Sequence, residues 1–118
     1  MPDDEYMTLD EYQKKAMRTN GQTHLTMLEA LQYAALAIAG EAGELADEIK
    51  KGIYHGHKLD TDKLIYEAGD VLWGLAYLGE VLGCGLEGIA RMNIAKLATR
   101  YPEKFTPGGG AHRGAKGT

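Results

Sequence analysis

The sequence predicts an all-α protein, and three observations support this class. Along most of the chain, apolar residues recur in steps of three and four, which is the spacing of one face of an α-helix. At two predicted helix starts, a threonine is followed three residues later by glutamate, as in the capping box. The apolar–polar alternation of a β-strand is not convincing in any segment. We therefore expect four helices packed as a bundle.

Start and stop signals define the first two helices. The first is expected over residues 9–18, after an N-cap at Thr8, and the segment Thr-Asn-Gly ends it. The second opens after Thr26 and reaches about residue 51, where Gly52 can end it.

The last two helices are separated by a Gly-Cys-Gly segment at residues 83–85. Asp60 or Thr61 can cap the third helix, which extends to about residue 82. The fourth helix follows the Gly-Cys-Gly segment and ends at residue 100 or 101, since Pro102 bars its continuation.

Length and composition predict one domain of a cytoplasmic protein. The 118 residues suffice for a single domain at about residues 8–105, flanked by flexible segments at 1–7 and at the Gly-rich 106–118. A net charge of −4 argues against nucleic-acid binding, and no apolar run approaches the ~20 residues of a membrane span. The acidic N-terminus is unlike a signal peptide, and one cysteine permits no internal disulfide.

Three glutamates of the second helix lie beside its predicted core-facing stripe. That stripe consists of Leu28, Leu31, Ala35, Ile38, Ala42, Leu45 and Ile49. Glu41, Glu44 and Glu48 each precede one of its last three members, on an adjoining stripe that is alanine-rich nearer the helix start. This is the opposite of a solvated charged face.

The third helix repeats the arrangement with Glu67 and Asp70, which directly precede two members of its own apolar stripe. If the two helices pack together, the carboxylates of Glu41, Glu44, Glu67 and Asp70 converge. Repulsion and desolvation oppose such a cluster, and a bound divalent cation relieves both. Oxygen ligands select hard ions, first Mg²⁺, with Mn²⁺ or Ca²⁺ as substitutes. The alternative is that these side chains are partly exposed and pair with lysines 50, 51 and 63.

The fourth helix carries the opposite charge, because Asn93, Lys96 and Arg100 share one of its faces. Acidic metal ligands facing such a line of cations suit a polyphosphate. Alternatively, the two cations only complement the dipole at the helix C-terminus. Trp73, three residues after Asp70, can either stack on a base or belong to the core.

These motifs resemble one known family. The segments EAGE at residues 41–44 and EAGD at residues 67–70, with 22 residues between them, resemble the ExxE…ExxD signature of MazG-like, all-α nucleoside triphosphate pyrophosphohydrolases. The segment NIAKLATRYP at residues 93–102 resembles the last helix of that family, and Tyr12-Gln13 with Ala16 and Thr19 its first. The similarity spans about residues 9–105.

The resemblance implies Mg²⁺-dependent hydrolysis of a (d)NTP to the monophosphate and pyrophosphate by water attack at the α-phosphorus. It also implies a homodimer or a pair of dimers, because related proteins build their sites near subunit contacts. Some members begin the motif with two adjacent glutamates, whereas Gly40 precedes Glu41 here, so Glu48 is a candidate for a further ligand or a base.

Roles follow for the matched positions. The resemblance implies that Glu41, Glu44, Glu67 and Asp70 hold the metal and that Lys96 and Arg100 contact phosphates. Beyond the matched positions, we expect Glu44 or Glu48 to act as the catalytic base and Lys51, Trp73 and Asn93 to contribute to substrate binding.

Three other functions fit parts of the pattern. A phosphoribosyl-ATP pyrophosphohydrolase shares the chemistry, with a larger nucleotide. A non-catalytic helical protein could bind a nucleotide or a partner in the acidic pocket without turnover. A di-iron carboxylate bundle is disfavoured, because no histidine stands three residues after any acidic residue of the cluster.

Overall fold

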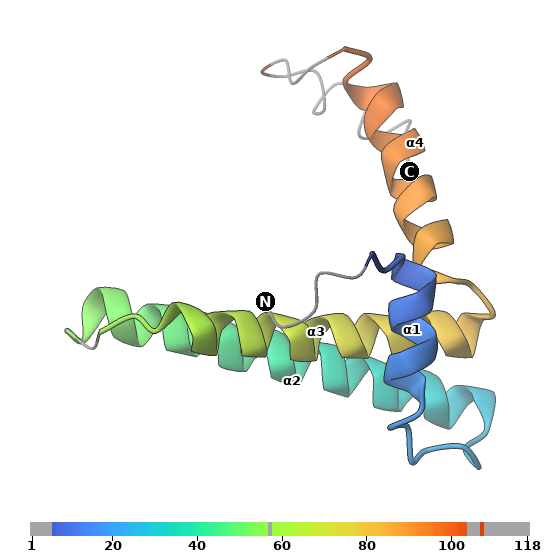
Figure 1. The fold of residues 1–118 in the computed structure, drawn as a ribbon, viewed down its shortest axis with the longest axis horizontal. Coiled ribbons are helices and arrows are strands. Elements are labelled where there is room, and N and C mark those ends of the chain that lie inside the picture. The colour runs from blue at the N-terminus through green and yellow to red at the C-terminus, as the bar shows by residue number, and fades with distance from the viewer. Residues whose placement is uncertain (1–5, 57, 104–106, 108–118) are drawn as a thin grey trace. The chain divides into compact units, whose positions relative to one another are not determined.

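The computed structural model describes residues 6–56, 58–103 and 107, and within them it contains helices but no β-strand. The helices are α1 (Leu9–Met17), α2 (Met27–Tyr54), α3 (Thr61–Leu82) and α4 (Leu86–Arg100) (Figure 1). The predicted all-α class is therefore confirmed. The chain divides into two compact units, Met1–Leu86 and Glu87–Thr118. The terminal segments predicted to be flexible lie outside the described residues, except for residues 6, 7 and 107.

Side-chain caps begin the first three helices. Thr8 accepts a hydrogen bond from the backbone N–H of Glu11 at 3.0 Å, and the Glu11 carboxylate accepts from the backbone N–H of Thr8 at 2.9 Å. Thr26 and Glu29 form the same reciprocal pair at 3.2 and 3.0 Å. Asp60 caps α3 by accepting from the backbone N–H three residues on. Both predicted capping boxes are confirmed.

The end of α2 differs from the prediction. The helix continues through Gly52 to Tyr54, and the backbone N–H of His55 still donates to the carbonyl of Lys51 at 3.1 Å. An interior glycine costs a helix about 1 kcal/mol relative to alanine, which the unbroken hydrogen bonds of a long helix can outweigh. The backbone turns only at Gly56, where φ is +71°. By contrast, α3 ends as predicted, with Gly83 in the left-handed conformation at φ +69°.

Helices α2 and α3 pack along each other as an antiparallel hairpin, and α1 packs across α3 (Figure 1). Tyr77 is the largest fully buried side chain. Its ring stacks on Trp73 at a centroid distance of 5.8 Å and meets the edge of Tyr33 at 5.2 Å. At Gly74, a Cβ atom would lie 2.9 Å from Cγ1 of Ile38, so the missing side chain lets α2 approach α3.

The prediction of which stripe of α2 faces the core was wrong in part. In this chain Leu28 is 67% exposed and Ile49 38% exposed, whereas Ala34, on the alanine-rich stripe, is completely buried. Small side chains on this stripe allow closer helix packing than leucine does, so the alanine stripe lies against α3. Glu41 follows seven residues after Ala34, and the acidic residues therefore continue the packed face itself.

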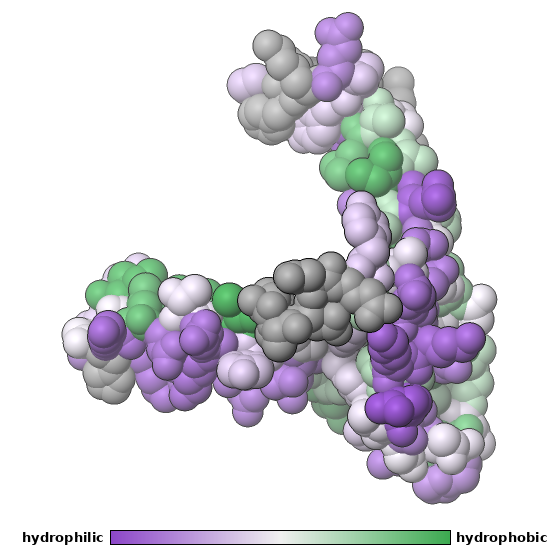
Figure 2. Space-filling model, viewed as in Figure 1, coloured by the Kyte–Doolittle hydropathy of each residue, from purple (hydrophilic) through white to green (hydrophobic). Residues whose placement is uncertain are grey.

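Much apolar surface remains exposed on the hairpin formed by α2 and α3. Hydrophobic patches are visible on it in Figure 2, and its exposed large apolar residues include Leu36, Ile53, Ile65 and Leu82. Among the described residues, no helix combines the length and apolar character that a membrane span requires.

Candidate active site

Acidic turns from two helices meet between α2 and α3. One carboxylate oxygen from each of Glu41, Glu67 and Asp70 lies within 4.8 Å of the others. Glu41 comes from α2, and Glu67 and Asp70 lie one turn apart on the face of α3 that meets it. The first two side chains are half-buried and Asp70 is exposed. Three of the four predicted metal ligands are thus brought together.

Glu41 has the most perturbed environment of the three. Its pKa is raised, first by a hydrogen bond with Glu44, then by burial, and then by the negative charges of Glu44, Asp70 and Glu67. Its Oε2 atom is buried and has no hydrogen-bond partner among the described residues. A buried acceptor without a donor is unfavourable, and a cation is a suitable partner for it. The donor set, entirely carboxylate oxygen, fits a hard divalent ion such as Mg²⁺ or Mn²⁺.

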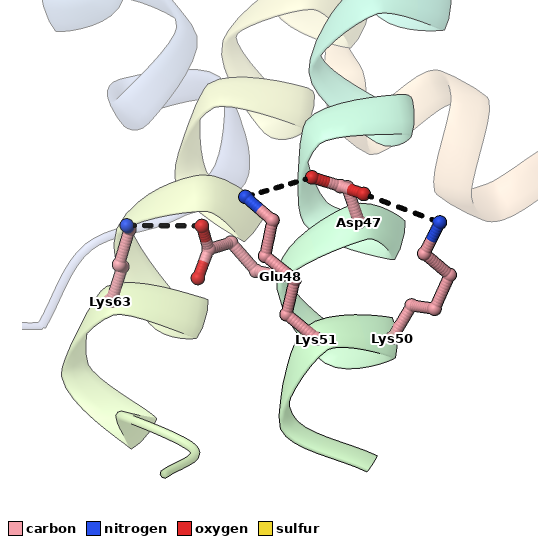
Figure 3. Close-up of polar contacts among 5 residues, drawn as sticks. All are labelled: Asp47, Glu48, Lys50, Lys51 and Lys63. Atoms are coloured by element: carbon pink, nitrogen blue, oxygen red, sulfur yellow. Dashed lines mark ion pairs between the residues drawn. The ribbon is translucent and has the colours of Figure 1, made fainter. Parts of the chain in front are cut away.

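The two candidate bases occupy different environments. Glu44 is exposed and lies outside the group of three, but it interacts with that group through Glu41. Glu48, one turn further along α2, forms an ion pair with Lys63 of α3 at 3.0 Å (Figure 3). The hydrogen bond with Glu48 and its negative charge raise the pKa of Lys63.

Lysines 50 and 51 do not neutralise the acidic group. Both reach Asp47 on their own helix, Lys51 at 3.1 Å and Lys50 at 3.7 Å (Figure 3). Lys51, chiefly through its hydrogen bond, lowers the pKa of Asp47. Among the described ion pairs, the alternative of lysine-paired glutamates holds for Glu48 alone. The predicted contact of Lys51 with substrate stays a prediction.

Trp73 joins α3 to the end of α1. Its indole N–H donates to Oγ1 of Thr19 at 2.9 Å and to the carbonyl of Ala16 at 3.3 Å. One ring face stacks on Tyr77. These contacts give Trp73 a structural role, and its predicted contact with a base stays a prediction.

The predicted substrate-binding residues of α4 belong to the second unit. Asn93 and Lys96 are exposed, and Arg100 is half-buried. The Nε atom of Arg100 is buried without a hydrogen-bond partner in the described part of the chain. Their predicted contacts with the nucleotide stay predictions.

Tyr12 is a neighbour of the acidic group that the sequence did not single out as a site residue. It is half-buried on α1, and its pKa is raised by burial and by the negative charge of Asp70. A tyrosine 58 residues away along the chain gives no local signal of this proximity. The resemblance of Tyr12-Gln13 to the first helix of a known family was the only available hint.

The helical fold and the grouped carboxylates define an all-α protein with a candidate site for a divalent cation. The chain matches the model of the MazG nucleotide pyrophosphohydrolase domain over residues 22–105, well over half of its length. The protein therefore belongs to the MazG nucleotide pyrophosphohydrolase family, which confirms the resemblance seen in its motifs. It is 32% identical over 114 residues to the Gene 37 protein of Mycobacterium phage L5, a match that covers 91% of this chain and 100% of the phage protein. No solved structure matches the chain.

Proposed function

We propose that the protein is a Mg²⁺-dependent pyrophosphohydrolase that converts a (d)NTP to the (d)NMP and pyrophosphate. The observation that carries this proposal is the meeting of carboxylates from Glu41, Glu67 and Asp70 around a buried, unpartnered oxygen. Membership of the family supports the reaction class.

Four side chains would hold the cation, namely Glu41, Glu44, Glu67 and Asp70. When bound, Mg²⁺, or Mn²⁺ in its place, polarises phosphate oxygens and lowers the pKa of water. The chain contributes an arrangement in which three of these carboxylates, those of Glu41, Glu67 and Asp70, already lie together, so only Glu44 has to move to complete the set.

Water attacks the α-phosphorus, a bond forms between its oxygen and phosphorus, and the bond from the α-phosphorus to the bridging oxygen breaks. Glu44 is the favoured acceptor of the proton from this water, because it is exposed and adjoins Glu41. Glu48 is the second candidate, but its carboxylate is already engaged in an ion pair with Lys63.

Cations would bind the phosphates and the leaving pyrophosphate, as Lys and Arg commonly do. We assign this role to Lys96 and Arg100 of α4. We also assign it to Lys51 of α2, which would have to break its ion pair with Asp47 to bind a phosphate. Trp73 and Asn93 are assigned to the nucleoside end of the substrate.

We also propose that the chain assembles as a homodimer or as a dimer of dimers. Few large apolar side chains are buried in the described part of the single chain, whereas many on α2 and α3 are exposed. Exposed apolar area of this kind usually marks an interface. Light scattering coupled to size exclusion tests this, and a monomer at micromolar concentration would reject it. A cytoplasmic location without nucleic-acid or membrane partners stays a prediction.

The activity is tested by incubating the full chain with each of the eight common nucleoside triphosphates, and with phosphoribosyl-ATP, with and without Mg²⁺. We expect ³¹P NMR to show a monophosphate and pyrophosphate only when Mg²⁺ is present, and ¹⁸O from labelled water to enter the monophosphate. Binding without turnover of any nucleotide would identify a non-catalytic protein instead.

Two substitutions connect the activity to the site. Glu44→Gln and Asp70→Asn are expected to abolish pyrophosphate release while the helical circular dichroism is retained. Glu80→Gln, which changes an exposed glutamate of α3 outside the acidic group, is the matched control and should retain full activity. Full activity in either of the first two variants would reject the assignment.

A further inference from the structure

Gln13 is a buried polar side chain to which neither the fold prediction nor the proposed reaction gives a role. It is 7% exposed. Its Nε2 donates to the carbonyl of Ala76 in α3 at 3.0 Å and to the carbonyl of Cys84 at 3.4 Å. Its Oε1 accepts from the backbone N–H of Leu86 at 2.9 Å. The one amide therefore binds the backbone on both sides of Gly85.

The segment that Gln13 binds joins α3 to α4. The end of α3 is closed by Gly83 at φ +69° and by a hydrogen bond from the N–H of Cys84 to the carbonyl of Gly79 at 2.8 Å. Gly85 follows, and α4 starts at Leu86. A junction with two glycines has unusually free backbone torsions unless other groups restrain it.

A second side chain of α1 lies on the same junction. If Gly85 carried a Cβ atom, that atom would lie 2.6 Å from Oδ1 of Asp10. Asp10 and Gln13 are three residues apart on α1 and so share a helix face. Two side chains on one face of α1 thus lie against the junction. Gln13 also accepts a hydrogen bond from the backbone N–H of Leu86, the first N–H of α4, and this N–H has no partner within its own helix.

We propose that Gln13 is a positioning residue that fixes the backbone of the junction at residues 83–86, including the first residue of α4. The inference rests on the proposed function, because α4 carries Lys96 and Arg100, which we assign to the phosphates. A glutamine suits the role because it donates to two carbonyls and accepts from one N–H without a buried charge. A glutamate here would direct acceptor oxygens at two carbonyl oxygens.

Hydrogen exchange tests the structural half of the proposal without any substrate. Gln13→Met keeps the side-chain length and removes all three hydrogen bonds. We expect the amides of residues 86–90 to exchange about tenfold faster in this variant, while those of residues 30–50 in α2 are unchanged. Gln32→Met, at an exposed glutamine of α2, is the matched control and should change neither region. Unchanged exchange at residues 86–90 in Gln13→Met would overturn the proposal.

Kinetics test the functional half. In Gln13→Met we expect KM for the nucleotide to rise about tenfold and kcat to change less, with unaltered Mn²⁺ affinity of the nucleotide-free protein. In a Lys96→Met background, Gln13→Met should add little, because both changes remove the same contact. If the increases in KM from Gln13→Met and Lys96→Met multiply in the double variant, or if Gln13→Met weakens Mn²⁺ binding as much as it raises KM, the effect is general destabilisation. Either result would overturn the positioning role.

A second variant covers the case in which Gln13→Met does not fold. Gly85→Val leaves the Gln13 side chain itself unchanged but places a branched side chain where its Cβ would lie 2.6 Å from Oδ1 and 3.0 Å from Cγ of Asp10, so it should raise KM in the same direction. Unchanged KM in Gly85→Val would overturn the proposal. If the unsubstituted protein hydrolyses no nucleotide, the proposed function and the positioning role both fail, whereas hydrogen exchange still decides whether Gln13 holds the junction.

Discussion

Two glycines of α3 offer a matched test of how closely α2 and α3 pack at the acidic site. Gly74, four residues after Asp70, is buried against Ile38, whereas a Cβ atom on Gly69 would meet nothing within 4 Å. Alanine at either position gains the same helix propensity, about 1 kcal/mol. Any difference between Gly74→Ala and Gly69→Ala therefore measures the cost of separating the helices.

The geometry gives the size of that difference. The added methyl of Gly74→Ala would lie 2.9 Å from Cγ1 of Ile38. Carbon atoms pack best at about 3.5–4.0 Å, so the two groups must move apart by at least about 0.6 Å. Overpacking of this kind costs about 1–3 kcal/mol. We expect Gly74→Ala to be about 0–2 kcal/mol less stable than the parent and Gly69→Ala to be about 1 kcal/mol more stable.

Urea unfolding of both variants without divalent cations measures these free energies, and an unchanged m value shows that they are comparable. The wider helix spacing should also weaken Mn²⁺ binding in Gly74→Ala, because Asp70 lies one helical turn from the added methyl group. If Gly74→Ala were as stable as Gly69→Ala, the close packing of α2 on α3 at this point would be refuted.

Two further predictions follow from the charges near the site. The pKa of Glu41 is raised from 4.5, so above pH 4.5 the folded state holds its proton more tightly than the unfolded state. The free energy of unfolding without metal should therefore fall as the pH rises from about 4.5 through the raised pKa. Urea titrations at a series of pH values should show a smaller fall in Glu41→Gln. An identical pH dependence of the two unfolding free energies would contradict the raised pKa. Lys63→Met removes the partly exposed pair with Glu48 and should leave the urea midpoint nearly unchanged, as should the control Lys50→Met. A clear fall of the midpoint in Lys63→Met alone would mean that the fold depends on this ion pair.

The helices could be predicted from the sequence because their signals are local. Thr8 and Thr26 each stand three residues before a glutamate, and Gly83 supplies the left-handed residue that ends α3. The end of α2 was missed because Gly52 resembles a stop signal, while the continued hydrogen bonding past it depends on the whole helix. The prediction of the packed stripe of α2 failed in part for a related reason, since the burial of Ala34 and the contact of Ile38 with Gly74 depend on how both helices pack together.

The acidic group could also be predicted, because the i, i+3 spacing of Glu67 and Asp70 fixes their common face before any tertiary contact is known. The ion pair of Glu48 with Lys63 was foreseen only as part of the alternative to a metal site, and the approach of Tyr12 to Asp70 was not predicted. The same is true of the bonds from Gln13 to residues 84 and 86. Each of these contacts joins segments far apart in the sequence and depends on how the helices pack. Hydrophobic periodicity describes one helix at a time and does not predict such contacts.

The central claim is that carboxylates from α2 and α3 jointly bind a hard divalent cation, and a Mn²⁺ titration of the nucleotide-free protein followed by electron paramagnetic resonance tests it most directly. We predict saturable binding that weakens at least about tenfold in Glu41→Gln and in Glu67→Gln, one from each helix, but not in Glu80→Gln. Equal Mn²⁺ affinity in Glu41→Gln and the unsubstituted protein would contradict the account.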